Sequence, residues 1–234
     1  MRSERELLVE FCSSYVITQA IASKVLEHGI VKVITNSRLM SQFVPLPVSV
    51  INSHAPVITY LDNEYPRCLF DLAEELPLVL WYQSNQLKLN VPRFRASVIG
   101  SNHPSLTDVK LLGNLLAQTH LDFLPITDAS VGVGELLLKL SIANQFPAAI
   151  VAASGISKYS LPLNWRQRRK FLGQGLILSE TPPHLALNRN RLLRRNRIIA
   201  AMSDAVIAIR PAKNSGASSI LHWAEQLGRE IHLI

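Results

Sequence analysis

Positive charge in this chain of 234 residues is concentrated in one segment, residues 158–203. That segment contains ten of the 24 lysines and arginines and a single acid, Glu180, so its formal charge is +9 while the rest of the chain carries −2. Its bases are Lys158, Arg166, Arg168, Arg169, Lys170, Arg189, Arg191, Arg194, Arg195 and Arg197. A local positive stripe on a nearly neutral body indicates a polyanionic partner, because bases that neutralise phosphates release condensed counterions. A purely solvating surface is the alternative, but such a surface usually mixes both signs of charge.

One block of this segment, Arg194-Arg195-Asn196-Arg197, has the chemistry for bidentate contact with phosphate. We expect residues 194–199 to lie across the end of a loop and the start of a helix, where guanidinium groups stand beside free backbone N–H groups. The structural alternative is that one of these arginines braces the edge of a sheet through backbone carbonyl groups. Trp165 and Tyr159 are the aromatic residues available to stack on bases, with packing as the alternative for each.

Three short turns have glycine and polar residues suited to holding phosphate through backbone N–H groups. Gly100-Ser101-Asn102 follows a predicted strand, Gly132 lies in the turn after the next strand, and Ser215-Gly216 precedes the last long helix. Glycine lets the backbone approach a ligand closely, and a helix start offers free N–H groups and a positive dipole end. An ordinary structural turn is the alternative for each. The sequence contains neither the G-x-G-x-x-G dinucleotide fingerprint nor a Walker A motif.

The remaining reactive residues form no recognisable catalytic or metal-binding pattern. No serine stands in a G-x-S-x-G elbow, and neither a pair of acids nor a Ser/His/Asp order suggests hydrolysis. The seven histidines show no paired spacing, and Cys12 and Cys68 lack metal-ligand spacing. We therefore expect no catalytic residues, no metal, no cofactor, and two free thiols in a reducing compartment.

The elements that must position these residues are predicted to form a doubly wound α/β domain. Short apolar segments, which have the character of strands in a mostly parallel sheet buried on both faces, occur at residues 78–82, 96–99, 123–126, 148–152, 176–178, 205–209 and 230–233. Helices are predicted between the later strands, at residues 107–118, 135–145, 166–172, 195–202 and 218–227. Ligands of such sheets bind at the carboxyl ends of the strands, near the point where the strand order reverses.

A small helical region is predicted to precede this domain. Residues 4–43 carry apolar side chains at roughly helical spacing, Gly29 is expected to end a helix, and residues 45–56 contain three prolines typical of a linker. We therefore divide the chain into a helical N-terminal domain with its linker (1–56) and the α/β domain (57–234). The chain has no apolar run long enough to cross a membrane and no signal-peptide core, so we expect a cytoplasmic protein with no membrane partner.

Five blocks occur in an order that is known from one protein family. They are Tyr65-Pro66-Arg67-Cys68-Leu69, Pro77-Leu78-Val79-Leu80, Val98-Ile99-Gly100-Ser101-Asn102, Gln174-Gly175-Leu176-Ile177-Leu178-Ser179-Glu180 and Arg194-Arg195-Asn196-Arg197-Ile198-Ile199-Ala200. With these blocks the chain resembles the DNA-processing protein A family (DprA/Smf), from about Tyr65 to its end. The last block matches the family's R-R-N-R-I-I-A at the right distance from its L-S-E, and this pair is specific.

The resemblance implies a Rossmann-like fold preceded by a small helical domain. It also implies a non-enzymatic protein that binds single-stranded DNA and hands it to a RecA-type recombinase during natural transformation. Members of the family are cytoplasmic, use no organic cofactor and pair through their Rossmann-like domains, so the resemblance implies a homodimer as well.

The chain departs from the family pattern in the expected phosphate pocket. Asn102 replaces the arginine of the V-G-S-R turn, and Arg210 stands where the family usually has an acid. Of the family's S-G-x-A-x-G-I-D turn, residues 127–134 retain the glycine at 132 and small residues, and they add the acid Asp128. We hypothesise that the extra bases at residues 166–170 compensate for these changes.

Taken together, turns, bases and resemblance predict one nucleic-acid-binding surface. Its predicted residues are Gly100, Ser101, Asn102, Gly132, Lys158, Arg166, Arg169, Lys170, Arg194, Arg195, Asn196, Arg197, Ser215 and Gly216.

Three other functions remain open on the sequence. A related Rossmann-like enzyme would hydrolyse nucleotides, although its P-G-G-x-G-T-x-x-E motif is absent. A protein-interaction module that has lost its DNA site is a second possibility, suggested by the apolar Leu192 and Leu193. A basic surface for anionic membrane is the third, but the stretch at residues 166–170 is short for an amphipathic helix.

Overall fold

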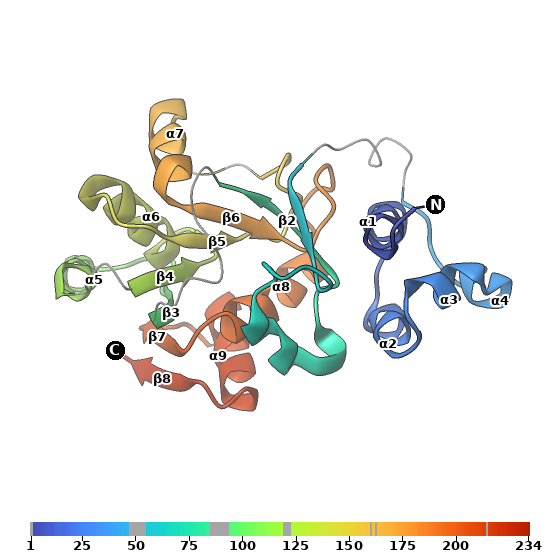
Figure 1. The fold of residues 1–234 in the computed structure, drawn as a ribbon. Helices are drawn as coiled ribbons and strands as arrows, with labels where there is room; N and C mark the ends of the chain where they lie inside the picture. Colours follow the sequence, from blue (N-terminus) through green and yellow to red (C-terminus); the bar gives the residue numbers. More distant parts are fainter. Residues whose placement is uncertain are drawn as a thin grey trace.

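The computed structural model describes residues 2–46, 55–84, 94–118, 123–159, 161, 163–213 and 215–234. Figure 1 shows a central sheet with helices on both faces, and a group of helices beside it that begins at the N-terminus. The strand order is β1-β2-β6-β5-β4-β3-β7-β8. The strands are β1 (Val57–Thr59), β2 (Val79–Gln83), β3 (Phe94–Gly100), β4 (Phe123–Thr127), β5 (Ala149–Val151), β6 (Leu176–Ser179), β7 (Ala205–Ile209) and β8 (Glu230–Leu233).

Most of the sheet is parallel. The strands from β6 through β5, β4, β3 and β7 to β8 all run the same way, whereas β2 is antiparallel to β6 and β1 is antiparallel to β2. Strands β4, β5, β6 and β7 are buried along their whole length, as expected of apolar strands that are covered on both faces. The predicted doubly wound, mostly parallel α/β fold is therefore confirmed.

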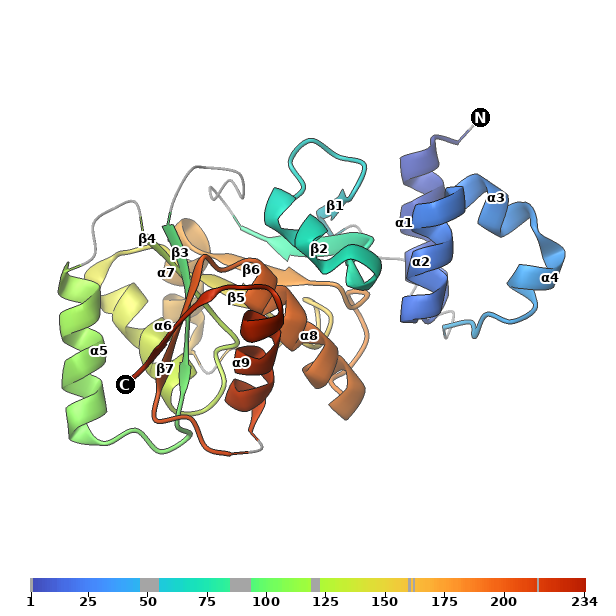
Figure 2. The ribbon, with the colours of Figure 1, turned by 90° about the horizontal axis from the view of Figure 1, so that it is seen from below.

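Helices cover the two faces of this sheet separately (Figures 1 and 2). One face carries α5 (Leu106–Gln118), α6 (Val133–Asn144) and α7 (Trp165–Gln174), and the other carries α8 (Arg189–Ala201), α9 (Gly216–Gln226) and the 3-10 helix η2 (Arg67–Glu75). Leu112 and Leu137 pack with Val98 in the first layer. Ile198 and Ile220 share a cluster with strand residues in the second. Both packed layers hold the loops at the carboxyl ends of the strands in place.

The N-terminal region forms α1 (Glu4–Ser14), α2 (Gln19–His28), α3 (Ile30–Thr35) and α4 (Ser37–Met40), which confirms its predicted helical character. Gly29, at φ +79°, ends α2 as expected. Leu8 of α1 belongs to the same buried cluster as Trp81 of β2, and Arg5 Nε donates to Asp62 Oδ1 at 2.8 Å. The N-terminal helices therefore pack directly against the α/β part of the chain, through α1. Most of the predicted linker, residues 47–54, lies outside the described residues, and the division at residue 56 stays a prediction.

The start of α8 differs from the sequence-based expectation. The expected helix began at residue 195, with residues 194–199 across a loop and a helix start, but α8 begins at Arg189. Asn188 caps it by accepting a hydrogen bond from Arg191 N at 2.9 Å, and asparagine is among the best N-cap residues. Residues 194–199 therefore lie in the helix interior, where the backbone N–H groups are taken by intrahelical hydrogen bonds.

None of the helices in the described part of the chain combines the length and the hydropathy that a bilayer crossing needs.

Candidate nucleic-acid interface

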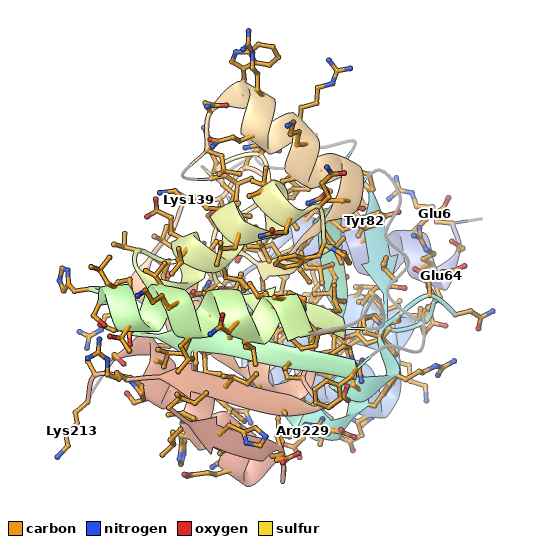
Figure 3. All side chains as sticks on the ribbon, turned by 90° about the vertical axis from the view of Figure 1, so that its left-hand side faces the viewer. Glu6, Glu64, Tyr82, Lys139, Lys213 and Arg229 are labelled. Atoms are coloured by element: carbon orange, nitrogen blue, oxygen red, sulfur yellow. The ribbon has the colours of Figure 1, made fainter. Side chains whose placement is uncertain are left out.

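The strand order reverses between β3 and β7. Starting from β3, the chain adds β4, β5 and β6 on one side, then returns to place β7 and β8 on the other. The loops after β3 and β7 leave the sheet side by side, because Ser101 N donates to Ile209 O at 2.9 Å. This carboxyl-end edge of the sheet is the position where doubly wound folds bind ligands, and Lys213 of the loop after β7 projects from it (Figure 3).

Two of the predicted glycines hold the loops of this edge together. A Cβ atom on Gly100 would lie 2.2 Å from Ile209 O, and one on Gly132 would lie 2.2 Å from Ser101 O. Gly132 also has φ +95°, which side-chain-bearing residues rarely adopt. Val133 N donates to Ser101 O at 3.1 Å and completes the contact between the loops. The structural-turn alternative therefore accounts for both glycines, which bring Ser101 and Asn102 to the edge.

The third predicted turn begins α9 at the same edge. The Ser215 hydroxyl caps the helix by accepting from Ser218 N at 3.3 Å, and it donates to Ala212 O. Gly216 is exposed and has open space around its Cα. Asn196 of α8 reaches Gly216 O with Nδ2 at 3.5 Å, so α8 supports this turn from behind.

Arg210 stands in the loop after β7 with φ +42°, in the left-handed region. Its guanidinium is about half exposed and pairs with Asp108 near the start of α5. Ser105 N also donates to Asp108 Oδ2 at 2.7 Å. The hydrogen bond from Arg210 holds the pKa of Asp108 below its usual value. Sequence reasoning noted Arg210 only as a departure from a family pattern and missed Asp108, although the Ser105-x-x-Asp108 spacing before an apolar run signals a capping box.

Arg195 is buried behind this edge. Its Nη1 donates to Val151 O at 2.9 Å, and its Nη2 pairs with Asp128 Oδ2 at 3.2 Å. Arg195 therefore braces the end of β5 through a backbone carbonyl group, which was the structural alternative for this block. Tyr159 is also a packing residue, since its hydroxyl donates to Asp128 O at 3.3 Å and burial raises its pKa.

Arg197 is the most deeply buried of the predicted bases, with a side chain that is 1% exposed. Its Nη1 and Nη2 donate to the two carboxylate oxygens of Glu180 at 2.7 and 2.6 Å, and its Nε donates to Glu75 O at 2.7 Å. Burial by itself would raise the pKa of Glu180, but Arg197 and Arg194 outweigh it and hold that pKa below its usual value. The prediction placed Arg195 and Arg197 on a DNA-facing surface, whereas both guanidinium groups are enclosed by protein acceptors.

Arg194 is partly exposed and points away from the switch point, toward the N-terminal helices. Its guanidinium donates to Ile17 O and lies 3.5 Å from Glu180. Together with Arg191 and Leu193 it lines a groove of about 560 Å³ between α8 and the N-terminal helices. The structure therefore separates the Arg194 side chain from the loops that Asn196 supports.

The remaining predicted bases are exposed. Lys158 follows β5, and Arg166, Arg169 and Lys170 lie on α7. None of these four has an ion pair with a described residue. Arg168, by contrast, turns inward and donates to Gln83 Oε1 at 3.1 Å. The exposed bases that have no ion pair with a described residue thus include Lys213 in the loop after β7, Lys158 after β5 and three bases on α7, rather than the buried part of α8.

The described residues include no cluster of three or more His, Cys, Asp or Glu side chains placed to hold a metal ion.

Among curated proteins, the chain is 24% identical over 156 residues to a putative DNA processing protein DprA of Mycobacterium tuberculosis, covering 66% of this chain and 40% of that protein. It is 24% identical over 179 residues to protein Smf of Synechocystis, covering 73% of this chain and 43% of that protein. The chain therefore spans about two fifths of the length of these relatives.

Solved structures show the same fold. DNA processing protein A from Streptococcus pneumoniae superposes with a TM-score of 0.69 at 20% identity, over 98% of this chain and 80% of that one. The Helicobacter pylori protein, whose structure concerns a single-stranded DNA binding mode, gives a TM-score of 0.64 at 21% identity, over 77% and 81% of the two chains. The family model of DNA recombination-mediator protein A matches residues 56–234, the whole sheet and the helices that cover it. The chain therefore belongs to the DNA recombination-mediator protein A family, as its sequence blocks suggested.

Proposed function

We propose that this chain binds single-stranded DNA along the carboxyl-end edge of its sheet, without catalysing a reaction on it. The observation that carries the proposal is the set of exposed bases at this edge that lack a carboxylate partner among the described residues, in a member of a DNA-processing family. The single-stranded DNA binding mode described for the Helicobacter pylori relative supports the choice of ligand. Binding of this kind is expected to be insensitive to sequence and to weaken with salt.

The predicted residues have two different roles in this proposal. Ser101 and Asn102 offer side-chain donors and Gly216 a backbone donor at the switch point, where Gly100, Gly132 and Ser215 shape the loops. Lys158, Arg166, Arg169 and Lys170 provide the positive field beside these loops. Arg195, Asn196 and Arg197 support the edge from inside α8.

We also propose that the bound DNA is passed to a RecA-type recombinase in natural transformation, and that the protein acts as a cytoplasmic homodimer. These steps rest on membership of the family. Because the chain spans only about two fifths of the length of the curated relatives, transfer to the recombinase and dimer formation need tests of their own, apart from the test of DNA binding.

Protein interaction is a second function that one observation favours. Leu187, Leu192 and Leu193 are all exposed at or near the start of α8, and Leu193 lines the groove of about 560 Å³. Exposed apolar side chains that border a groove are typical of interaction sites. Capture of purified RecA by the wild type but not by Leu192→Ser/Leu193→Ser would support this role.

Fluorescence anisotropy of a labelled oligothymidine, titrated at several salt concentrations, tests the DNA-binding proposal. Arg169→Ala/Lys170→Ala removes two unpaired bases of α7, so we expect weaker binding and a salt slope that is smaller by up to about 1.4, or about 0.7 for each lost phosphate contact. Lys32→Ala/Arg38→Ala is the matched control, because it removes the same charge from exposed positions on α3 and α4. Wild-type protein that fails to bind at low salt would refute the proposal.

A further inference from the structure

Trp165, the first residue of α7, leaves its side chain largely in solvent. It is 70% exposed, whereas Trp81 in β2 is 2% exposed. The guanidinium carbon of the neighbouring Arg166 lies 5.2 Å from the centre of the Trp165 ring, within the range of a cation–π contact. The indole remains open to solvent despite this contact, so most of its surface is available to a ligand.

The charged residues of the helix that carries Trp165 are all cationic. Helix α7 has no acidic residue, and Arg166, Arg169 and Lys170 on its exposed side have no ion pair with a described residue. On α6, which packs beside α7, the carboxylate of Glu135 is paired with Lys139 at 2.7 Å. An aromatic face set among unpaired bases has the two features that bind single-stranded nucleic acid, a stacking surface for bases and positive charge for phosphates.

We propose that Trp165 and Arg166 form a base-stacking platform for single-stranded nucleic acid at the α7 end of the carboxyl-end edge. This inference rests on the proposed DNA-binding function and adds to it a residue that recognises bases rather than phosphates. In the strand order β7-β3-β4-β5-β6, strand β6, which follows α7 in the chain, lies four strand spacings, or about 19 Å, from β7. An oligonucleotide must therefore be several nucleotides long to contact both the loop after β7 and helix α7.

The structure favours single-stranded nucleic acid over a membrane or a duplex. A membrane-binding helix exposes a continuous apolar face, but Phe171 of α7 is fully buried and Leu172 is partly buried. A duplex keeps its bases stacked on one another, so its bases are not free to stack on an indole. Trp165 therefore gives the surface a means of distinguishing unpaired from paired strands.

The platform is tested by comparing the binding of two ligands. One is an oligothymidine, and the other is an abasic oligonucleotide with the same number of phosphates. We expect Trp165→Leu to weaken binding of oligothymidine about tenfold, since stacking contributes about 1–3 kcal/mol per base. Binding of the abasic strand and the salt slope should not change. Trp165→Phe keeps an aromatic ring and should retain most of the affinity.

The matched control is Phe70→Leu. Phe70 is 41% exposed and has Arg67 stacked over its ring at 5.8 Å, but it lies on η2 beside Asp71 and Glu74, so we expect no effect on DNA binding. Oligothymidine binding that is equal in Trp165→Leu and wild type would overturn the inference while leaving the proposed function standing. Wild-type protein that binds neither oligonucleotide would refute the function itself. If Trp165→Leu lost binding to phosphatidylserine vesicles but kept binding to oligothymidine, the base-stacking platform would also be overturned, in favour of a membrane contact.

Intrinsic fluorescence gives a second readout of the same contact. Oligothymidine should quench wild-type emission by stacking on Trp165, whereas Trp165→Phe should bind without that quenching, because Trp81 is buried and Trp223 is partly buried. Equal quenching in both proteins would contradict stacking on Trp165.

Discussion

At the scale of single residues, the arginines of the basic segment at residues 158–203 divide into two kinds. Arg197 is enclosed with Glu180 and its guanidinium also donates to the backbone of Glu75 and Arg194, whereas Arg166 on α7 is exposed. A buried charge needs a partner because desolvation is costly, so an enclosed arginine holds the fold together rather than a ligand. Exposed bases without a partner retain their field for a polyanion.

Removing one member of the buried pair is expected to destabilise the protein strongly. Arg197→Leu leaves the Glu180 carboxylate without its bidentate partner, so we expect the free energy of unfolding to fall by about 3–5 kcal/mol. Urea unfolding measures this loss. The double variant Arg197→Leu/Glu180→Leu should be more stable than Arg197→Leu alone, and a double variant that is less stable would contradict the account.

The lowered pKa of Glu180 predicts a dependence of stability on pH. Because the folded-state pKa lies below the ordinary value of 4.5, the contribution of Glu180 is fully present above that value and is lost as pH falls through the folded-state pKa. Wild-type protein should therefore lose more free energy of unfolding between about pH 6 and about pH 3 than Glu180→Gln does. Equal losses, measured by urea unfolding at each pH, would show that Glu180 does not titrate in this way.

At the scale of elements, the loops of the carboxyl-end edge depend on close backbone contact. The loop after β4 meets the loop after β3 at Gly132, and Gly100, the last residue of β3, lies against Ile209 at the end of β7. Helix α8 supports these loops because it begins at Arg189 and runs behind them, with Asn196 reaching the turn before α9. The candidate DNA-binding site therefore depends on the packing of several elements: the loops form the edge, and most of the exposed bases lie on a neighbouring helix, α7.

Two glycine substitutions separate these roles. Gly132→Ala places a Cβ atom 2.2 Å from Ser101 O at a positive φ, so we expect a loss of stability larger than about 1 kcal/mol and disturbed loops. Gly113→Ala, in the interior of α5 with open space around it, should stabilise the protein by about 0.5–1 kcal/mol. Thermal unfolding of the two variants tests both signs, and a stabilising Gly132→Ala would contradict the interlocked loops.

At the scale of the whole molecule, the N-terminal helices and the α/β part share a buried core. Leu8 of α1 is fully buried in the cluster that contains Trp81 and Ile150 of the sheet. The ion pair between Arg5 and Asp62 links the same two regions. We therefore expect the chain to unfold as one cooperative unit, although its sequence suggests a division at residue 56.

Leu8→Ala tests this cooperativity. The substitution should cost about 2–5 kcal/mol, as large-to-small changes in a packed core do. All three tryptophans lie in residues 57–234, so their fluorescence reports only on that part. A shift of the fluorescence transition by Leu8→Ala to lower urea would show joint unfolding, and an unshifted transition would show that the helices unfold separately. Val31→Ala, at an exposed position of α3, is the control.

The sequence by itself determined the fold class, the strands of the described sheet other than β1, the helices between the later strands, and the family. Apolar strands buried on both faces leave a local pattern, and the blocks around residues 65–69, 174–180 and 194–200 lie in a recognisable order. It also located the loops of the carboxyl-end edge, because those loops must follow the strands. Helix boundaries were less determined, and α8 began earlier than expected because the cap at Asn188 was not recognised.

Only the tertiary structure decided which bases face solvent. Arg197 meets Glu180 from 17 positions away, and Arg195 meets Val151 O and Asp128 from 44 and 67 positions away. These partners come together through packing of α8 against β5 and β6, which no local pattern in the chain reveals. Burial therefore removed Arg195 and Arg197 from the surface, whereas Lys158, Arg166, Arg169, Lys170 and Arg189 stay exposed, with Trp165 beside the bases of α7.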